Sequence, residues 1–144
     1  MRDDDLPALG SDLTLYAARL VRLVRREVPQ PVGVRVLSIL DESGPTGITQ
    51  LAAIDRCRQP TMSGTVNGLV ERGWVTKTPD PDDARGSLVS LTAAGRRTLA
   101  TAREANGAAI AARLLGSGTT PEDLATAVSV LRTVLEPPKG SSTS

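Results

Sequence analysis

The stretch from Arg58 to Thr92 constrains the fold most, because its apolar residues change from a helical to an extended period. Pro60 suits a first helical turn, where its missing N–H loses no hydrogen bond. Gly73 suits the position just after a helix, which often has a positive φ. The helix predicted between them has one apolar face, with side chains at i, i+4, i+7 and i+8: Met62, Val66, Leu69 and Val70.

Two short apolar runs follow this helix, and a turn rich in Pro and Asp separates them. Residues 74–77 and 88–91 predict the two strands of a hairpin, and residues 78–83 predict the turn. Thr92 is a suitable N-cap for a further helix. A helix, a hairpin and a second helix in this order are typical of a winged helix-turn-helix.

Two helices are predicted before this stretch. The first covers residues 32–42, and residues 43–47 form a loop. Thr49 is a suitable N-cap for a short second helix, and residues 56–59 make the turn into the helix that contains Pro60. Two short helices joined by a brief turn match the helix-turn-helix pattern. The expected core positions of the two helices are Val36, Leu37, Leu40, Leu51, Ala52 and Ile54.

Amphipathic helices are predicted at both ends of the chain. One runs from Ser11 or Asp12 to about Val28, and a long one starts at Ala93. A last helix is capped by Thr120, and its apolar stripe consists of Leu124, Val128, Leu131 and Leu135. Neither end has an obvious partner within the chain that could bury its apolar face. We therefore expect a two-fold homodimer, with a closed monomer as the alternative.

The predicted fold class is mainly α with a small β-hairpin wing, in which dimerisation helices at both ends flank the winged helix-turn-helix. The expected segments are a flexible N-terminus (residues 1–10), an N-terminal dimerisation helix (11–30), a DNA-binding region (31–92), C-terminal dimerisation helices (93–136) and a disordered tail (137–144).

Composition argues against an enzyme and against a bound metal or cofactor. Histidine is absent, Cys57 is the only cysteine, and the spacings of nucleotide-binding glycine loops do not occur. The formal net charge is +1, so any binding of nucleic acid must depend on local charges.

No apolar run approaches the length of a membrane span, and no signal peptide is visible, so we expect a cytoplasmic protein. Cys57 is either a small buried side chain or a thiol activated by the arginines on both sides of it.

The helix that contains Pro60 has an unusual outward face, which is polar but uncharged. A helix exposed only to water more often carries Glu and Lys, which are better helix formers. Short hydrogen-bonding side chains can read donors and acceptors in the major groove of DNA. The alternative is a surface helix of poor propensity that meets no partner. The outward positions are Gln59, Thr61, Ser63, Gly64, Thr65, Asn67 and Gly68.

The segment from Asp80 to Gly95, DPDDARGSLVSLTAAG, resembles the D-x-R…LT-x-x-G signature of the MarR family of bacterial transcription regulators. The segment Gly73–Val75 resembles the residues that lead into the wing of that family. The order of the predicted elements also agrees from about Leu13 to Leu135. The residues that match the signature in register are Asp83, Arg85, Leu91, Thr92 and Gly95.

The resemblance implies a homodimer that binds double-stranded DNA. The helix over residues 60–72 would enter the major groove, and the wing would carry Arg85 to the adjacent minor groove, whose negative potential attracts arginine. Asp83 would support the wing by a salt bridge to the guanidinium of Arg85; the alternative is an ion pair of the turn without a role in DNA binding. The candidate DNA-binding residues are Gln59, Pro60, Thr61, Ser63, Gly64, Thr65, Asn67 and Arg85.

Gly64 departs from the family, in which several members carry a basic residue at about this position.

The resemblance also implies an effector site between the terminal helices and the winged unit, for which Tyr16 and Arg19 are the candidates and a small aromatic compound is the expected ligand. The leading hypothesis is therefore a dimeric repressor that a small ligand releases from DNA. The alternatives are a ligand-independent architectural DNA binder and a protein-interaction module that has lost DNA binding.

Overall fold

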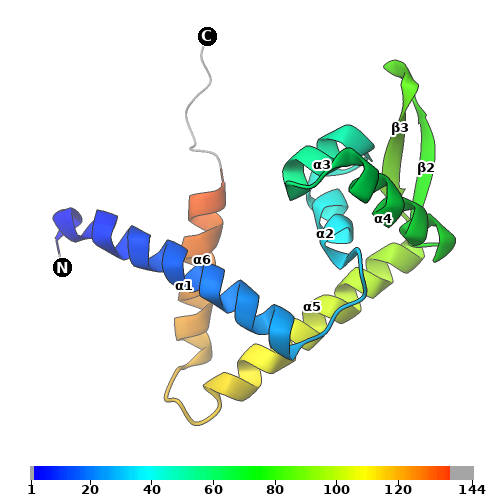
Figure 1. Ribbon diagram of the computed structural model, residues 1–144. Coiled ribbons are helices and arrows are strands. Elements are labelled where there is room, and N and C mark those ends of the chain that lie inside the picture. Colours follow the sequence, from blue (N-terminus) through cyan, green and yellow to red (C-terminus); the bar gives the residue numbers. More distant parts are fainter. Residues whose placement is uncertain (1, 137–144) are drawn as a thin grey trace. The chain divides into compact units, whose positions relative to one another are not determined.

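The computed structural model describes residues 2–136 (Figure 1). Its contacts form two compact units, residues 1–109 and residues 110–144, and the boundary falls inside one long helix. The tail predicted for residues 137–144 lies outside the described residues. Within the described part, no helix is both long enough and apolar enough to cross a membrane.

The fold is mainly α with a small antiparallel sheet, as the sequence predicts. The helices are α1 (Leu6–Glu27), α2 (Val34–Ser43), α3 (Ile48–Asp55), α4 (Gln59–Glu71), α5 (Ala93–Leu114) and α6 (Pro121–Leu135), and a short 3-10 helix, η1 (Asp3–Asp5), precedes them. The strands are β1 (Thr46–Gly47), β2 (Val75–Asp80) and β3 (Asp83–Leu91).

The sheet has the order β1-β3-β2, and all its pairs are antiparallel. β2 and β3 form the long hairpin that projects beyond α4 (Figure 1). β1 is only two residues long and pairs Thr46 with Val89. A loop was predicted for these residues, because a strand of two residues is too short to show an alternation of apolar and polar side chains. The strand forms only because the edge of β3 provides its hydrogen-bonding partners. The hairpin is also longer than predicted, since pairing continues outward to Asp80 and Asp83.

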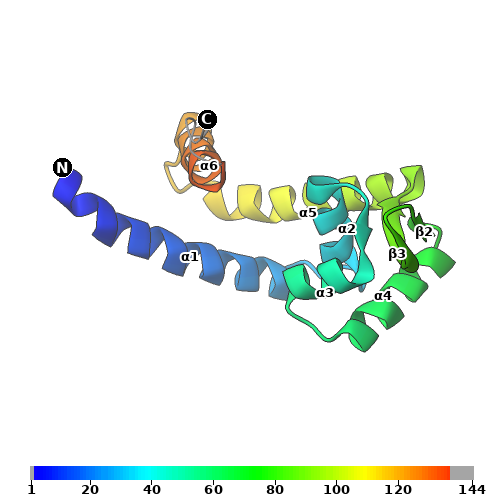
Figure 2. The same ribbon diagram turned by 90° about the horizontal axis from the view of Figure 1, so that it is seen from above.

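One apolar core holds the first unit together, and α2, α3, α4 and the sheet surround it (Figures 1 and 2). The predicted inward positions of α4 are confirmed, because Met62, Val66 and Leu69 are all at most 1% exposed. Val70 and Ile54 were predicted to be inside but are exposed, since each lies at the margin of the buried face of its helix. The other large side chains that are fully buried are Val36, Leu37, Leu51, Val75 and Val89.

Helix boundaries agree with the sequence where a side chain marks them. Pro60 lies in the first turn of α4, and Gly73 follows that helix with a φ of 75°. Two predictions are wrong. α1 begins at Leu6 instead of near Ser11, so most of the segment expected to be flexible is helical, and α3 is preceded by Gly47 rather than capped by Thr49.

The second unit contains the end of α5 and all of α6. The predicted cap is confirmed: the backbone N–H of Asp123 donates to Thr120 Oγ1 over 3.1 Å, and the backbone N–H of Thr120 donates to Asp123 Oδ2 over 2.9 Å. These bonds hold the pKa of the Asp123 carboxyl below its usual value. Within this protomer α6 has no buried residue, and Val128 and Val134 are 46% and 66% exposed.

Candidate nucleic-acid interface

The outward face of α4 is made of short polar side chains and two glycines. Met62, Val66 and Leu69 anchor the opposite face in the core, so the helix is fixed in its rotation. Every candidate residue of α4 is exposed or half-buried. The Thr65 hydroxyl donates to the Thr61 carbonyl over 3.1 Å, which leaves its oxygen as an acceptor toward a partner.

Gly64 and Gly68 have no packing function within the described protomer. A Cβ built at either position would meet no atom within 4 Å. Glycine inside a helix costs up to about 1 kcal/mol relative to alanine. The two glycines therefore weaken α4, and no contact in the protomer requires them. Because neither has a side chain, a partner can come close to the backbone of the helix at these positions.

The turn between α3 and α4 brings two arginines to the start of α4. Arg56 adopts a left-handed conformation with a φ of 53°, and it closes the turn through its backbone N–H, 3.3 Å from the Ala53 carbonyl oxygen. Arg58 is the residue that precedes α4. Both side chains are exposed beside a helix N-terminus, where backbone N–H groups favour anions. Sequence reasoning considered these arginines only as neighbours of Cys57, although their place in the turn was a signal for phosphate contact.

Cys57 itself is half-buried and packs against the core. Its backbone N–H donates to the Ala52 carbonyl over 3.0 Å. This environment supports the structural reading of the residue, as a small apolar side chain.

The tip of the wing is a tight turn held by aspartate side chains. The backbone N–H of Asp82 donates to Asp80 Oδ1 over 2.8 Å, and the backbone N–H of Arg85 donates to Asp83 Oδ1 over 3.0 Å. The expected ion pair is absent, since no described carboxylate lies within 4.0 Å of the Arg85 guanidinium. The short Asp83 side chain instead accepts a hydrogen bond from the backbone of the turn, as aspartates in turns commonly do. The Arg85 side chain is exposed.

Three comparisons with known proteins agree with this architecture. The sequence profile of the MarR family matches residues 31–87. An uncharacterized HTH-type transcriptional regulator of Mycobacterium leprae is 34% identical over 128 residues, which cover 86% of this chain and 89% of that protein. The chain belongs to the MarR family. It is a transcriptional regulator, and this membership confirms the prediction that it is not an enzyme.

Solved structures of MarR from E. coli share the fold. The wild-type apo form is 23% identical with a TM-score of 0.63, covering 91% of this chain and 96% of that one. A mutant MarR from E. coli, complexed with operator DNA, is 23% identical with a TM-score of 0.55, covering 91% of this chain and 94% of that one.

Two residues of the MarR-family signature, Thr92 and Gly95, have structural roles in this chain. Thr92 Oγ1 donates to the Gly73 carbonyl over 2.6 Å and accepts from the backbone N–H of Gly95 over 3.1 Å. A Cβ at Gly95 would overlap the Trp74 carbonyl oxygen, so a larger residue would displace the start of α5. The signature thus fixes the first turn of α5 against the start of β2.

Tyr16 and Arg19 are the two candidates for the effector site. They contact one another, with the Arg19 guanidinium carbon 5.4 Å from the centre of the Tyr16 ring. Tyr16 is 60% exposed. Neither residue lines a cavity of about 740 Å³ in the first unit. This part of the effector prediction therefore remains a prediction.

That cavity lies between the C-terminal half of α1, α2 and α5, and it extends to Thr65 on α4. Its lining is mostly aliphatic, as at Leu20, Val24 and Leu99. Arg35 also lines it and pairs with Asp55, with Arg35 Nη2 2.6 Å from Asp55 Oδ1. This pair joins the start of α2 to the end of α3, immediately before the turn into α4.

Proposed function

We propose that the protein is a dimeric, sequence-specific regulator that inserts α4 into the major groove and Arg85 into the minor groove. The observation that carries the proposal is the pairing of an uncharged hydrogen-bonding face on α4 with an arginine at the wing whose guanidinium has no ion-pair partner among the described residues. A protein with the same fold, the mutant MarR from E. coli, was crystallised in complex with operator DNA. The DNA-binding region would be residues 31–92.

Affinity would come from arginines and a lysine at the edges of this face. Arg56 and Arg58 precede α4, and Lys77 is exposed on β2. Contacts of such residues with phosphates release counterions, so they provide affinity that does not depend on base sequence. Base readout would come from the short side chains Gln59, Thr61, Ser63 and Asn67, which favours operators recognised partly by DNA shape.

Dimer formation would bury the apolar surfaces that the terminal helices expose. On α1, Leu6 and Leu15 are 63% and 51% exposed, and α6 exposes Val128 and Val134. Scattered exposed side chains are normal, but a helix without any buried residue is not stabilised by packing in the protomer. A second copy related by two-fold symmetry would cover such surfaces on both protomers.

A small ligand would relieve repression. The cavity of about 740 Å³ falls within the usual range of ligand pockets, and it contacts the recognition helix at Thr65. A ligand that enters it can change the position of α4 only if it binds one arrangement of the helices better than another. Arg25, Arg35 and Arg103 line the cavity, and Arg35 and Arg103 are paired with Asp55 and Asp41. Arg25 has no ion pair among the described residues, so it is the positive charge that would attract an acidic ligand.

Selection of DNA from random duplexes tests the proposal. The full-length protein is incubated with the pool at near-physiological salt, and the recovered sequences are compared. The expected result is an inverted repeat with half-sites about one helical turn apart, and a promoter that contains the repeat should be repressed in a reporter strain. Recovery of no common sequence would contradict specific binding. Together with intact folding, it would favour a protein-interaction module.

A further inference from the structure

One stripe of side chains on α1 reads the same in both directions, except that the charges change sign. Its members follow the alternating spacing of four and three residues that keeps side chains on one face of a helix. They are Asp5, Leu9, Asp12, Tyr16, Arg19, Leu23 and Arg26. Outward from Tyr16, each direction has a charge, then a leucine and then a second charge. The charges are negative toward the N-terminus and positive toward the C-terminus, so the stripe complements a copy of itself that runs the other way.

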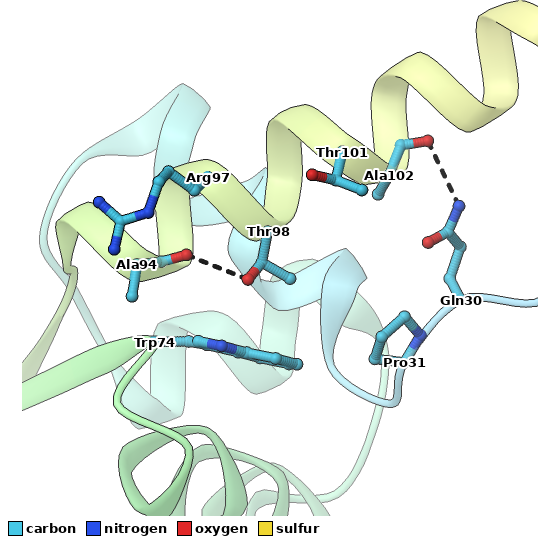
Figure 3. A pocket seen from close by; sticks show the side chains of 8 residues that line it. All are labelled: Gln30, Pro31, Trp74, Ala94, Arg97, Thr98, Thr101 and Ala102. Atoms are coloured by element: carbon cyan, nitrogen blue, oxygen red, sulfur yellow. Dashed lines mark hydrogen bonds between the residues drawn. The ribbon is translucent and has the colours of Figure 1, made fainter.

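Most of this stripe is open in the described protomer. Tyr16 and Leu9 are 60% and 45% exposed, and all four charged members are exposed as well. Val24 lies on a different side of the helix, where it is half-buried and lines the cavity of about 740 Å³. Figure 2 shows the first half of α1 extending away from α2 and α3. The loop after α1 is fixed to α5, because the Gln30 amide nitrogen donates to the Ala102 carbonyl over 3.3 Å (Figure 3). The helix is therefore anchored at one end and accessible to a partner along the rest.

The charges of the stripe have no ion-pair partner among the described residues. Asp12 and Arg19 cannot pair with one another, because seven residues of helix separate them by about 10.5 Å. The helix dipole favours acids in the first turn and bases in the last turn. Asp12 and Arg19 both lie further than one turn from the ends of α1, so the dipole does not account for them. The Arg19 guanidinium carbon lies 5.4 Å from the centre of the Tyr16 ring, which keeps this charge on the stripe.

We propose that two copies of α1 pair antiparallel across a two-fold axis at Tyr16, with Asp12 of each chain opposite Arg19 of the other. This arrangement rests on the dimer proposed above and specifies how its first helices meet. Leu9 and Leu23 lie at equal distances from the axis, about 10.5 Å along the helix, so each meets the other across the pair. The two Tyr16 rings meet on the axis itself, where an aromatic pair gains from stacking.

The order of the charges determines both the direction of pairing and the identity of the partner. In a parallel pair, aspartates would face aspartates and arginines would face arginines, and such contacts are repulsive. A related regulator whose first helix lacks this order would leave the charges unpaired. The stripe thus favours a second copy of this chain over other members of the family. It also gives Tyr16 and Arg19 a role other than ligand contact.

Charge reversal tests the pairing through the composition of mixed dimers. Asp12→Lys and Arg19→Glu each place like charges opposite one another in a homodimer, whereas a mixed dimer of the two variants restores both pairs. The two full-length chains are coexpressed, one with a mass tag, and the dimers are counted by native mass spectrometry. We expect about four fifths or more mixed dimer, against about half for random pairing.

Arg25→Glu is the matched control for Arg19→Glu. It changes the net charge equally, but Arg25 lies on the side of α1 that lines the cavity. Its mixture with Asp12→Lys should give the random proportion. A chain that carries both Asp12→Lys and Arg19→Glu should dimerise with itself as strongly as the wild type in sedimentation. Random proportions in both mixtures would overturn the pairing and leave the dimer in place, whereas a monomeric wild type would overturn both proposals.

Disulfide trapping locates the axis independently of charge. Cys57 is replaced by alanine, so that an introduced cysteine is the only thiol. Tyr16→Cys should link to its own copy rapidly under mild oxidation, because the Cα atoms of a disulfide lie within about 7 Å of one another. Leu9→Cys should not link to its own copy, which lies about 21 Å away along the paired helices, but should link to Leu23→Cys in a mixture. Equal rates for Tyr16→Cys and Leu9→Cys alone, or no link at Tyr16→Cys in a dimer, would overturn the proposed axis.

Discussion

Asp83 supports the wing through the backbone of Arg85 and not through its guanidinium. The carboxylate oxygen Oδ1 of Asp83 lies 3.0 Å from the backbone nitrogen of Arg85, and the arginine side chain has no carboxylate partner among the described residues. The aspartate thus shapes the turn, while the arginine keeps its whole hydrogen-bonding capacity for another molecule. Five donors on a planar group suit a narrow minor groove.

Asp83→Asn and Asp83→Ala distinguish these two roles of the carboxylate. The asparagine variant would keep a side-chain oxygen for the N–H of Arg85 and lose a negative charge near the phosphates, so DNA affinity should stay the same or rise a few-fold. The alanine variant should lose the turn bond, at a cost of about 1 kcal/mol to the wing, and bind DNA more weakly. Fluorescence anisotropy at fixed salt measures both affinities. A loss of tenfold or more in Asp83→Asn would show that a salt bridge forms in the complex.

Gly95 lies so close to the backbone of Trp74 that a larger residue at position 95 should destabilise the fold. Gly95→Ala would place a Cβ against the Trp74 carbonyl oxygen, so the first turn of α5 must shift. The expected loss is about 1–3 kcal/mol in the free energy of unfolding, measured by chemical denaturation at one protein concentration. Gly107→Ala in the same helix is the control, because a Cβ there meets nothing within 4 Å. That variant should gain up to about 1 kcal/mol; equal effects of the two substitutions would contradict the packing account.

Gly64 offers a test of the recognition helix that is independent of the wing. Gly64→Ala should stabilise the fold by up to about 1 kcal/mol, since the site is open in the protomer. Gly64→Arg should raise DNA affinity and steepen its salt dependence by about one phosphate contact. Anisotropy titrations over a range of salt concentrations measure both. Weaker binding by both variants would instead mean that DNA approaches the backbone at this glycine, and no effect from either would mean that DNA does not meet this face.

The proposed dimer rests on α1 and α6, and α6 has two faces for a matched comparison. Leu131→Asp puts a charge into the apolar stripe and should dissociate the dimer or unfold the chain, because a buried unpaired charge is costly. Ser129→Asp lies on the other side of the same helix and should leave the dimer intact. Sedimentation at micromolar concentration, together with circular dichroism, measures assembly and folding. A stable wild-type monomer, or equal effects of the two variants, would refute the proposed interface.

Several helix boundaries that one side chain marks locally were predicted correctly. Pro60, Gly73, Thr92 and Thr120 mark helix boundaries through their own backbone or hydroxyl, and the structure has each of them where the sequence indicated. The buried face of α4 followed from its period in the same way.

Features that depend on distant partners could not be predicted. β1 exists only because Thr46 meets Val89 on β3. The cavity between α1, α2 and α5 likewise requires segments that are far apart in the chain. The outer half of the hairpin was missed because the residues between Asp80 and Ser87 are polar and show no apolar alternation. The role of Asp83 was missed for a different reason, because a carboxylate two residues from an arginine suggests an ion pair as readily as a turn bond.

The most direct test of the account is the DNA affinity of Arg85→Ala, measured by anisotropy at fixed salt on the selected duplex and on a scrambled duplex. Arg85→Lys keeps the charge and serves as the control, and circular dichroism checks that all variants are folded. We predict that Arg85→Ala loses roughly tenfold or more on the selected duplex and less on the scrambled one, and that Arg85→Lys recovers only part of the loss. Unchanged affinity of a folded Arg85→Ala variant for the selected duplex would contradict the insertion of the wing into the minor groove.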